Sequence, residues 1–187
     1  MKDKICNQDL LQLYNELTEK WYRYYSEQPV LKFVKLAQKV IVSGLVLYCC
    51  VRLAWFPLLF IDPYKGVIKY RDKELEIRDT ALLFIIRHWY LEPQRFQSEW
   101  SPRRDYSYLH KVSERQARRI VKEVLGVEPK TARLACAAHI ACTEDVETAA
   151  KYYDTARWYL RRLLAEKPDN PNFKQIVIAR YMGVGVR

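Results

Sequence analysis

The chain has 187 residues, half of them hydrophobic and only five of them glycine, with a formal net charge of +10 and an isoelectric point near 9.4. This composition allows one domain with a substantial core, or two small helical lobes, and it excludes an intrinsically disordered chain. A basic surface attracts polyphosphates or anionic lipid, so the charge points to a negatively charged partner.

The first quarter of the chain is predicted to be helical. Asn7 can cap a first helix, in which apolar residues recur at helical spacing as far as Tyr25. Ser26 and Pro29 mark a restart, and a second helix is predicted over residues 30–55. Its lysines, Lys32, Lys35 and Lys39, all lie in the first half, so this helix should pass from the surface into the interior.

Residues 40–61 form an apolar run whose single charge is Arg52. About 20 apolar residues suffice to cross a bilayer, so a membrane span is one interpretation. Arg52 falls near the midpoint of the run and Pro57 breaks the helix soon afterwards, and both features count against a span. The preferred interpretation is a central helix buried by its own domain, with the membrane alternative left open.

The residues after Pro57 contain turn signals and then a second apolar helix. Partial alternation predicts a small exposed β-hairpin near residues 66–78, although a helix remains possible there. Asp79 is predicted to cap a short helix, TALLFIIRHWYL, which stops before Pro93 and should pair with the central helix.

The second half of the chain is predicted to be helical after a basic linker. Ser113 and Gln116 form a capping box for a helix closed by Gly126, and Pro129 starts an alanine-rich helix. Thr143 is predicted to cap one long helix to about Glu166, and a final short helix is expected over 173–182. The predicted class is all-α, with an N-terminal lobe at 1–93, a linker at 94–112 and a C-terminal bundle at 113–187.

No pattern of catalytic or metal-ligating residues emerges. The five cysteines are odd in number, none has zinc-site spacing, and they fit free thiols in a reducing cytoplasm. The three histidines are scattered, and the N-terminus has no signal-peptide pattern. We therefore expect a cytoplasmic protein that is not an enzyme and carries no cofactor or metal.

The clearest functional signal is a set of basic side chains in the linker and on two helices. Within residues 94–122 there are eight basic and three acidic residues, interleaved with Phe96, Trp100, Tyr106 and Tyr108. Arginines at one-turn spacing can meet phosphates, and aromatic side chains can stack on unpaired bases. The candidate nucleic-acid-binding residues are Arg95, Arg103, Arg104, Lys111, Arg115, Arg118, Arg119, Lys122, Arg157, Arg161 and Arg162.

A helix-turn-helix is a second interpretation of residues 117–134, where Lys130, Thr131 and Arg133 would begin the recognition helix. Two features depart from that pattern. Lys122 stands where a small residue normally packs the two helices, and the second helix is alanine-rich. A sequence-specific DNA-binding regulator is therefore ranked second.

The helical run, with its basic faces at Arg115, Arg118, Arg119 and Lys122 and at Arg157, Arg161 and Arg162, resembles the small subunits of CRISPR effector complexes. These are basic, all-helical proteins that hold target or displaced DNA by its backbone. The resemblance implies a non-catalytic subunit of a ribonucleoprotein complex, contacting DNA or RNA without sequence specificity and flanked by other protein subunits. The remaining alternative is a membrane-associated or structural interaction protein whose basic face meets anionic lipid or an acidic partner.

Overall fold

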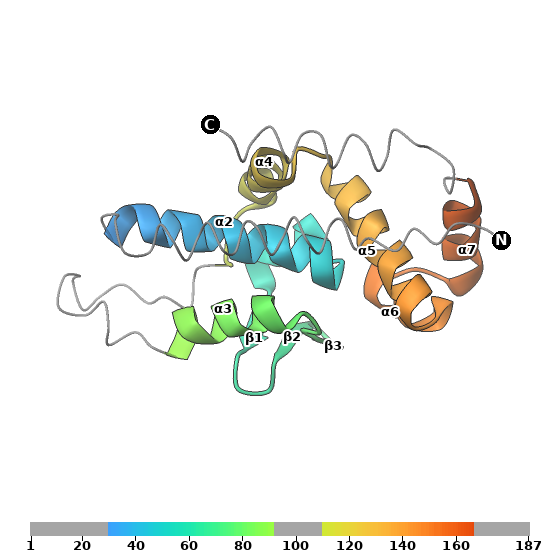
Figure 1. The fold of residues 1–187 in the computed structure, drawn as a ribbon, viewed down its shortest axis with the longest axis horizontal. Helices are drawn as coiled ribbons and strands as arrows, with labels where there is room; N and C mark the ends of the chain where they lie inside the picture. The colour runs from blue at the N-terminus through green and yellow to red at the C-terminus, as the bar shows by residue number, and fades with distance from the viewer. Residues whose placement is uncertain (1–29, 92–109, 167–187) are drawn as a thin grey trace.

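The computed structural model describes residues 30–91 and 110–166 (Figure 1). The predicted helices at 7–25 and 173–182 and nearly all of the predicted linker lie outside these ranges. The described part is mostly helical, as predicted, but it also contains a small antiparallel sheet, so the all-α class is correct only as a statement of what dominates.

The central helix α2 (Val30–Cys49) is the element on which the others pack. The predicted helix over 30–55 is too long, because Cys50 adopts a left-handed conformation (φ 53°) and ends it. There the Val51 N–H donates to the Leu45 carbonyl at 3.2 Å, which satisfies one carbonyl of the last turn. The chain continues as a 3₁₀ helix, η1 (Leu53–Leu58), which contains Pro57.

The apolar run is largely buried within the protein: Ile41, Val42, Leu45 and Val46 have no exposed surface. Among residues 30–91 and 110–166, no helix is both long enough and apolar enough to cross a bilayer.

A three-stranded antiparallel sheet follows, made of β1 (Phe60–Asp62), β2 (Val67–Tyr70) and β3 (Lys73–Glu76) in that order. The predicted hairpin at 66–78 is confirmed as β2 and β3. Strand β1 was not predicted, since three residues carry too little alternation to be recognised before they pair. Ile61, Ile68 and Leu75 stand opposite one another across the sheet and are buried on one face.

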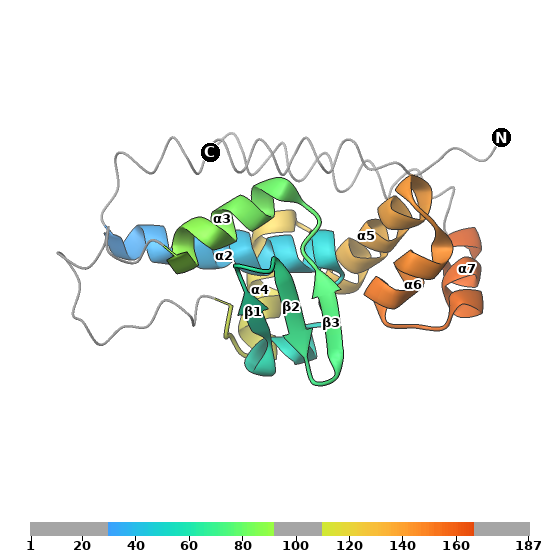
Figure 2. The ribbon, with the colours of Figure 1, turned by 90° about the horizontal axis from the view of Figure 1, so that it is seen from below.

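Helix α3 (Thr80–Leu91) packs against α2, as predicted. Asp79 caps it, because its carboxylate accepts the Leu82 N–H at 2.6 Å. Arg87 of α3 donates to the carbonyls of Pro63 and Tyr64, and thereby holds the loop between β1 and β2. Figure 2 shows α3 and the sheet together on one side of α2.

The remaining helices are α4 (Glu114–Leu125), α5 (Pro129–Thr143), α6 (Val146–Tyr153) and α7 (Arg157–Glu166). The single helix predicted from Thr143 to Glu166 is wrong in two ways. Thr143 ends α5, and Asp145 is the residue that caps α6 by accepting the Thr148 N–H. Asp154 then breaks the helix in a left-handed conformation (φ 59°).

One continuous core joins these elements. Helices α4 and α5 both pack on α2, and α5 packs on α6, so buried side chains run without a break from Ala37 to Leu160. Figure 1 shows α4 and the sheet flanking α2, with α5, α6 and α7 beyond its C-terminal end. The helices assigned from sequence to two lobes therefore share their interior.

Candidate nucleic-acid interface

Helix α4 presents one apolar and one basic face, and its start is fixed by the predicted capping box. The Ser113 hydroxyl accepts the Gln116 N–H at 3.2 Å, and the Gln116 side chain accepts the Ser113 N–H at 3.0 Å. Gly126 closes the helix at φ 67°. The inner residues Ala117, Ile120, Val121 and Leu125 are buried against α2 and η1, so the outer face is rigidly held.

The four basic residues of that outer face differ in their partners. Arg118 lies 3.5 Å from the carboxylate of Glu114 and 3.7 Å from that of Glu128, and Lys122 pairs with Glu128 as well. Arg115 and Arg119 are exposed and have no ionic partner among the described residues. Two of the four predicted positive charges are thus neutralised by acidic side chains of the protein itself, and the other two are not.

The linker part of the candidate site is represented in the described residues by Lys111, which is exposed. Arg95, Arg103 and Arg104, together with the four aromatic residues interleaved with them, lie outside those residues. Their contribution to the site stays a prediction.

Helix α7 carries the second group of predicted arginines. Arg157, Arg161 and Arg162 are all exposed, and Arg157 lies 3.7 Å from the Glu147 carboxylate. Asp154, three residues before Arg157, pairs instead with Arg52 and Lys73. The helix break at Asp154 turns that carboxylate towards the end of α2.

One aromatic residue beside these arginines was not singled out from the sequence. Trp158 is 69% exposed and makes an edge contact with Tyr159, with ring centroids 5.7 Å apart and planes at 77°. Its position between Arg157 and Arg161 on one short helix was the available signal. Without the helix break at Asp154, however, sequence alone could not place it on the outside.

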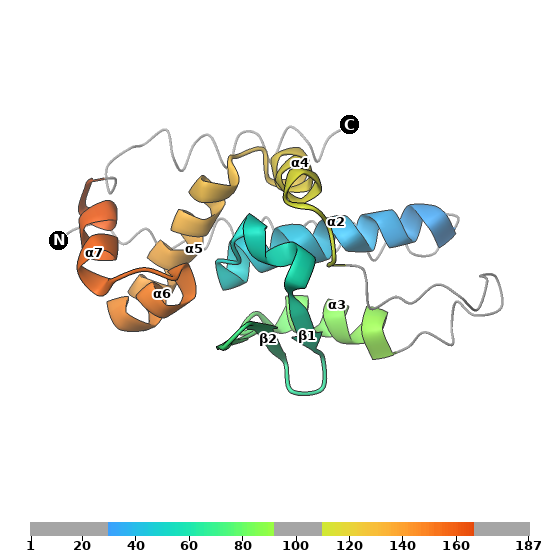
Figure 3. The ribbon, with the colours of Figure 1, turned by 180° about the vertical axis from the view of Figure 1, so that it is seen from behind.

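The two basic groups are separate in space. Figure 3 shows α4 beside α2 and α7 at the far end, with α5 and α6 between them. The structure therefore presents two basic patches: the α4 patch (Arg115, Arg118, Arg119, Lys122) and the α7 patch (Arg157, Arg161, Arg162).

The helix-turn-helix interpretation depends on α5 exposing side chains to DNA. Instead, α5 packs between α2 and α6, with Leu134, Ala135, Ala137 and Ala138 buried. Arg133 points inward, where its guanidinium donates to the carbonyls of Cys50 and Tyr153, each at 2.7 Å. Lys130 is exposed, but it stands alone at the start of the helix.

Three of the thiols, Cys49, Cys50 and Cys136, and the imidazole of His110 are buried in the interior. Burial raises the pKa of Cys49 and Cys50 well above the usual value, so both are neutral thiols. Cys136 is also buried and unbridged. No group of three or more His, Cys, Asp or Glu within 30–91 and 110–166 is placed to hold a metal ion.

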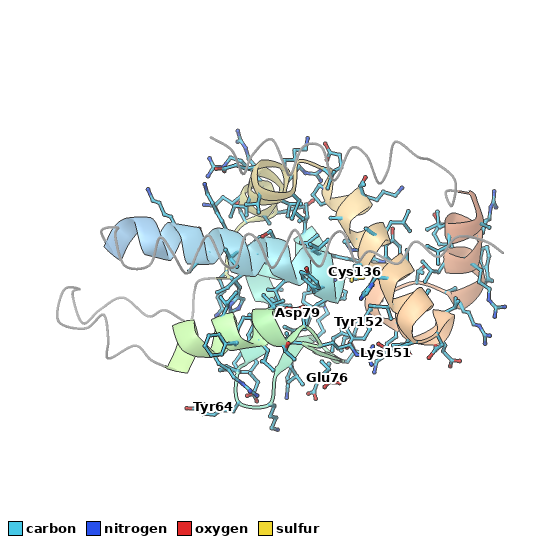
Figure 4. The ribbon with its side chains drawn as sticks, viewed as in Figure 1. Tyr64, Glu76, Asp79, Cys136, Lys151 and Tyr152 are labelled. Atoms are coloured by element: carbon cyan, nitrogen blue, oxygen red, sulfur yellow. The ribbon has the colours of Figure 1, made fainter. Side chains whose placement is uncertain are left out.

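A groove of about 530 Å³ lies between the β2–β3 hairpin and α6. Near it, the Tyr152 hydroxyl donates to the Glu76 carbonyl at 2.8 Å, which joins α6 to β3 (Figure 4). The groove is lined by side chains of both charge signs, the acidic Asp72, Glu74 and Asp154 and the basic Lys73 and Lys151. Such a lining does not favour a polyanion.

Comparison with known proteins gives no further guide to the site. No family model, no curated protein and no solved structure matches this chain.

Proposed function

We propose that this chain is a non-catalytic nucleic-acid-binding subunit of a larger assembly, which holds the phosphate backbone without reading base sequence. The observation that carries the proposal is the pair Arg115 and Arg119. Both are exposed, they lie one turn apart on a rigidly packed helix, and neither is neutralised by an acidic side chain of the described residues.

Unpaired arginines on a fixed helix suit phosphate binding for two reasons. A guanidinium binds phosphate oxygens through two parallel hydrogen bonds, and each neutralised phosphate releases bound counterions into solution. No internal ion pair has to be broken first. Arg118 and Lys122 would have to leave Glu114 or Glu128 to make the same contact, so they should contribute less.

The same proposal includes the kind of complex in which this chain would act. A basic chain whose described residues are mainly helical, and whose sequence carries no catalytic motif, is compatible with a small subunit of a CRISPR effector complex in the cytoplasm, beside other protein subunits. The sequence-specific regulator receives less support, since α5 is packed between two helices and its Arg133 serves the interior. An acidic protein or anionic lipid remains the alternative partner for the α4 patch.

The test compares two matched double variants of the α4 patch across a salt series. Wild type, Arg115→Gln/Arg119→Gln and Arg118→Gln/Lys122→Gln are titrated with labelled single- and double-stranded oligonucleotides of unrelated sequence. Wild type should bind all sequences similarly. Loss of two phosphate contacts should make the log–log salt slope on single strands shallower by about 1.4 in the first variant, and by less in the second.

Other results would point elsewhere. Binding confined to one duplex sequence would favour the regulator. Absence of binding at low salt would reject the proposal, and liposome sedimentation and pull-downs would then follow. Equal changes of the salt slope in the two double variants would show that pairing with Glu114 and Glu128 does not decide which cations meet phosphate.

A further inference from the structure

Helix α7 has an outer face of unusual composition. Its inner side is set by Leu160, which is fully buried, with Leu163 and Leu164 packed partly on the core. The opposite side carries Arg157, Trp158, Arg161 and Arg162, all exposed. No acidic residue occurs from Arg157 to Ala165, so the charged side chains of this outer face are all basic, and Trp158 is its most exposed aromatic residue.

Trp158 differs from the core residue Trp55 in its exposure and in its ring contacts. Trp55 is 5% exposed and stacks on Tyr70, with ring centroids 4.9 Å apart and planes at 11°. Trp158 is 69% exposed, and its ring meets the neighbouring Tyr159 ring edge-on instead of stacking on it. Most of the indole is therefore available to a ligand.

The arginines surround this ring at helical spacing. Arg161 and Arg162 stand three and four residues after Trp158, which are the positions whose side chains lie next to it on a helix surface. Arg157 precedes it, and its ion pair with the exposed Glu147 is of the kind that contributes little and is readily exchanged. Positive charge thus lies on both sides of an open aromatic surface.

We infer that α7 is a stacking site for an unpaired base, with Trp158 as the platform and Arg157, Arg161 and Arg162 as contacts to the flanking phosphates. The inference rests on the proposed function and narrows its ligand class to single-stranded nucleic acid. Every base has a π face, so the site is tolerant of sequence, whereas a duplex keeps its bases stacked and offers only phosphates.

A protein partner is the main competing occupant, because tryptophan and arginine are also common at protein interfaces. Besides Trp158, the outer face of α7 exposes only Tyr159 and alanine as apolar residues. So small an apolar area argues against a protein partner. Three arginines around one ring match alternating base and phosphate groups better than they match an apolar protein surface.

The test separates stacking from phosphate binding by removing bases from the ligand. The probes are a fluorescein-labelled oligothymidylate of about 20 nucleotides, its duplex with the complementary strand, and an abasic sugar–phosphate chain of equal length. The proteins are wild type, Trp158→Ala, Trp158→Phe and Arg161→Gln. Tyr64→Ala is the matched control, because Tyr64 is 77% exposed but lies in the β1–β2 loop, away from α7 (Figure 4).

Wild type should bind oligothymidylate more tightly than the abasic chain. Trp158→Ala should lose about 5- to 150-fold in affinity for oligothymidylate and almost none for the abasic chain or the duplex. Trp158→Phe should lose less, since it keeps a ring, and Arg161→Gln should weaken binding to all three probes. Tyr64→Ala should match wild type, and circular dichroism should show that all variants keep their helices.

Two sets of results would overturn the inference, and they are distinguishable. Stacking on α7 is wrong, and the proposed function stands, in either of two cases. In the first, wild type binds nucleic acid and Trp158→Ala binds oligothymidylate equally well. In the second, Trp158→Ala loses as much affinity for the abasic chain as for oligothymidylate. If wild type binds none of the probes at low salt, both fall, and a protein captured by wild type but not by Trp158→Ala would identify α7 as a protein interface.

Discussion

His110 is a polar residue in the interior, where it anchors the approach to α4. It is 2% exposed, and its Nε2 lies 2.6 Å from the Leu59 carbonyl, so Nε2 must carry the proton that it donates. Burial, with a smaller effect from Lys111, lowers the pKa of His110 to about 4. The imidazole therefore stays neutral in the folded protein at pH values where the unfolded chain takes up a proton.

This difference predicts that His110 contributes to the acid sensitivity of the fold. The folded-state pKa lies below the unfolded value of about 6.5, so the stabilisation is complete above that pH and is lost as the pH falls towards 4. At pH 5 the protonation of His110 in the unfolded chain should lower the free energy of unfolding by about 2 kcal/mol relative to its value above pH 6.5. In urea unfolding at pH 7 and pH 5, His110→Gln, which keeps a donor for Leu59, should show a smaller pH dependence than wild type. An unchanged pH dependence would contradict the assignment.

At the scale of elements, the break between α6 and α7 decides where the α7 patch faces. Asp154 ends α6 in a left-handed conformation, and the Thr155 N–H donates back to the Ala150 carbonyl at 3.1 Å. Glycine is the usual residue at such a position. Here the aspartate carboxylate also pairs with Arg52 and Lys73, and so ties the end of α6 to the end of α2 and to the hairpin.

Substitutions at Asp154 should separate the backbone effect from the charge effect. Asp154→Ala loses both the carboxylate and tolerance of positive φ, whereas Asp154→Gly loses only the carboxylate. Asp154→Gly should therefore be more stable than Asp154→Ala by about 1 kcal/mol, measured by urea unfolding. Asp154→Asn should resemble Asp154→Gly. If alanine were as stable as glycine, the left-handed helix break would not be important for folding.

At the scale of the whole molecule, Arg133 joins three helices. It lies on α5, donates to the carbonyls of Cys50 at the end of α2 and of Tyr153 at the end of α6, and stacks 4.5 Å from the Tyr153 ring centroid. Both carbonyls belong to helix ends, which have no intrahelical donor. The arginine therefore replaces missing helix hydrogen bonds and links the parts that sequence assigns to separate lobes.

A shared interior predicts that the two halves unfold together. Circular dichroism and tryptophan fluorescence should report one coincident urea transition. Arg133→Met, which keeps an unbranched apolar side chain but leaves two carbonyls without donors, should lower the free energy of unfolding by about 3 kcal/mol without splitting that transition. Arg119→Met on the exposed face of α4 is the control and should change stability little. Two separate transitions in wild type would instead support independent lobes.

The sequence by itself determined those features that depend on neighbours along the chain. The capping box at Ser113, the stop at Gly126, the start at Pro129, the cap at Asp79 and the β2–β3 hairpin all follow from local hydrogen bonding and backbone preference. The amphipathic pattern of α4 likewise predicted which of its residues face outward, and the structure confirms that orientation.

Tertiary structure decided the features that depend on distant partners. The breaks at Cys50 and Asp154 were not predicted from the sequence. Both residues adopt left-handed conformations where arginines from other elements bind the Cys50 carbonyl and the Asp154 carboxylate. Strand β1 exists only through its pairing with β2. The Arg118–Glu114 pair is local, at i,i+4 spacing. The pairing of Lys122 with Glu128 across the turn at Gly126 and the exposure of Trp158 among arginines depend instead on how the helices pack.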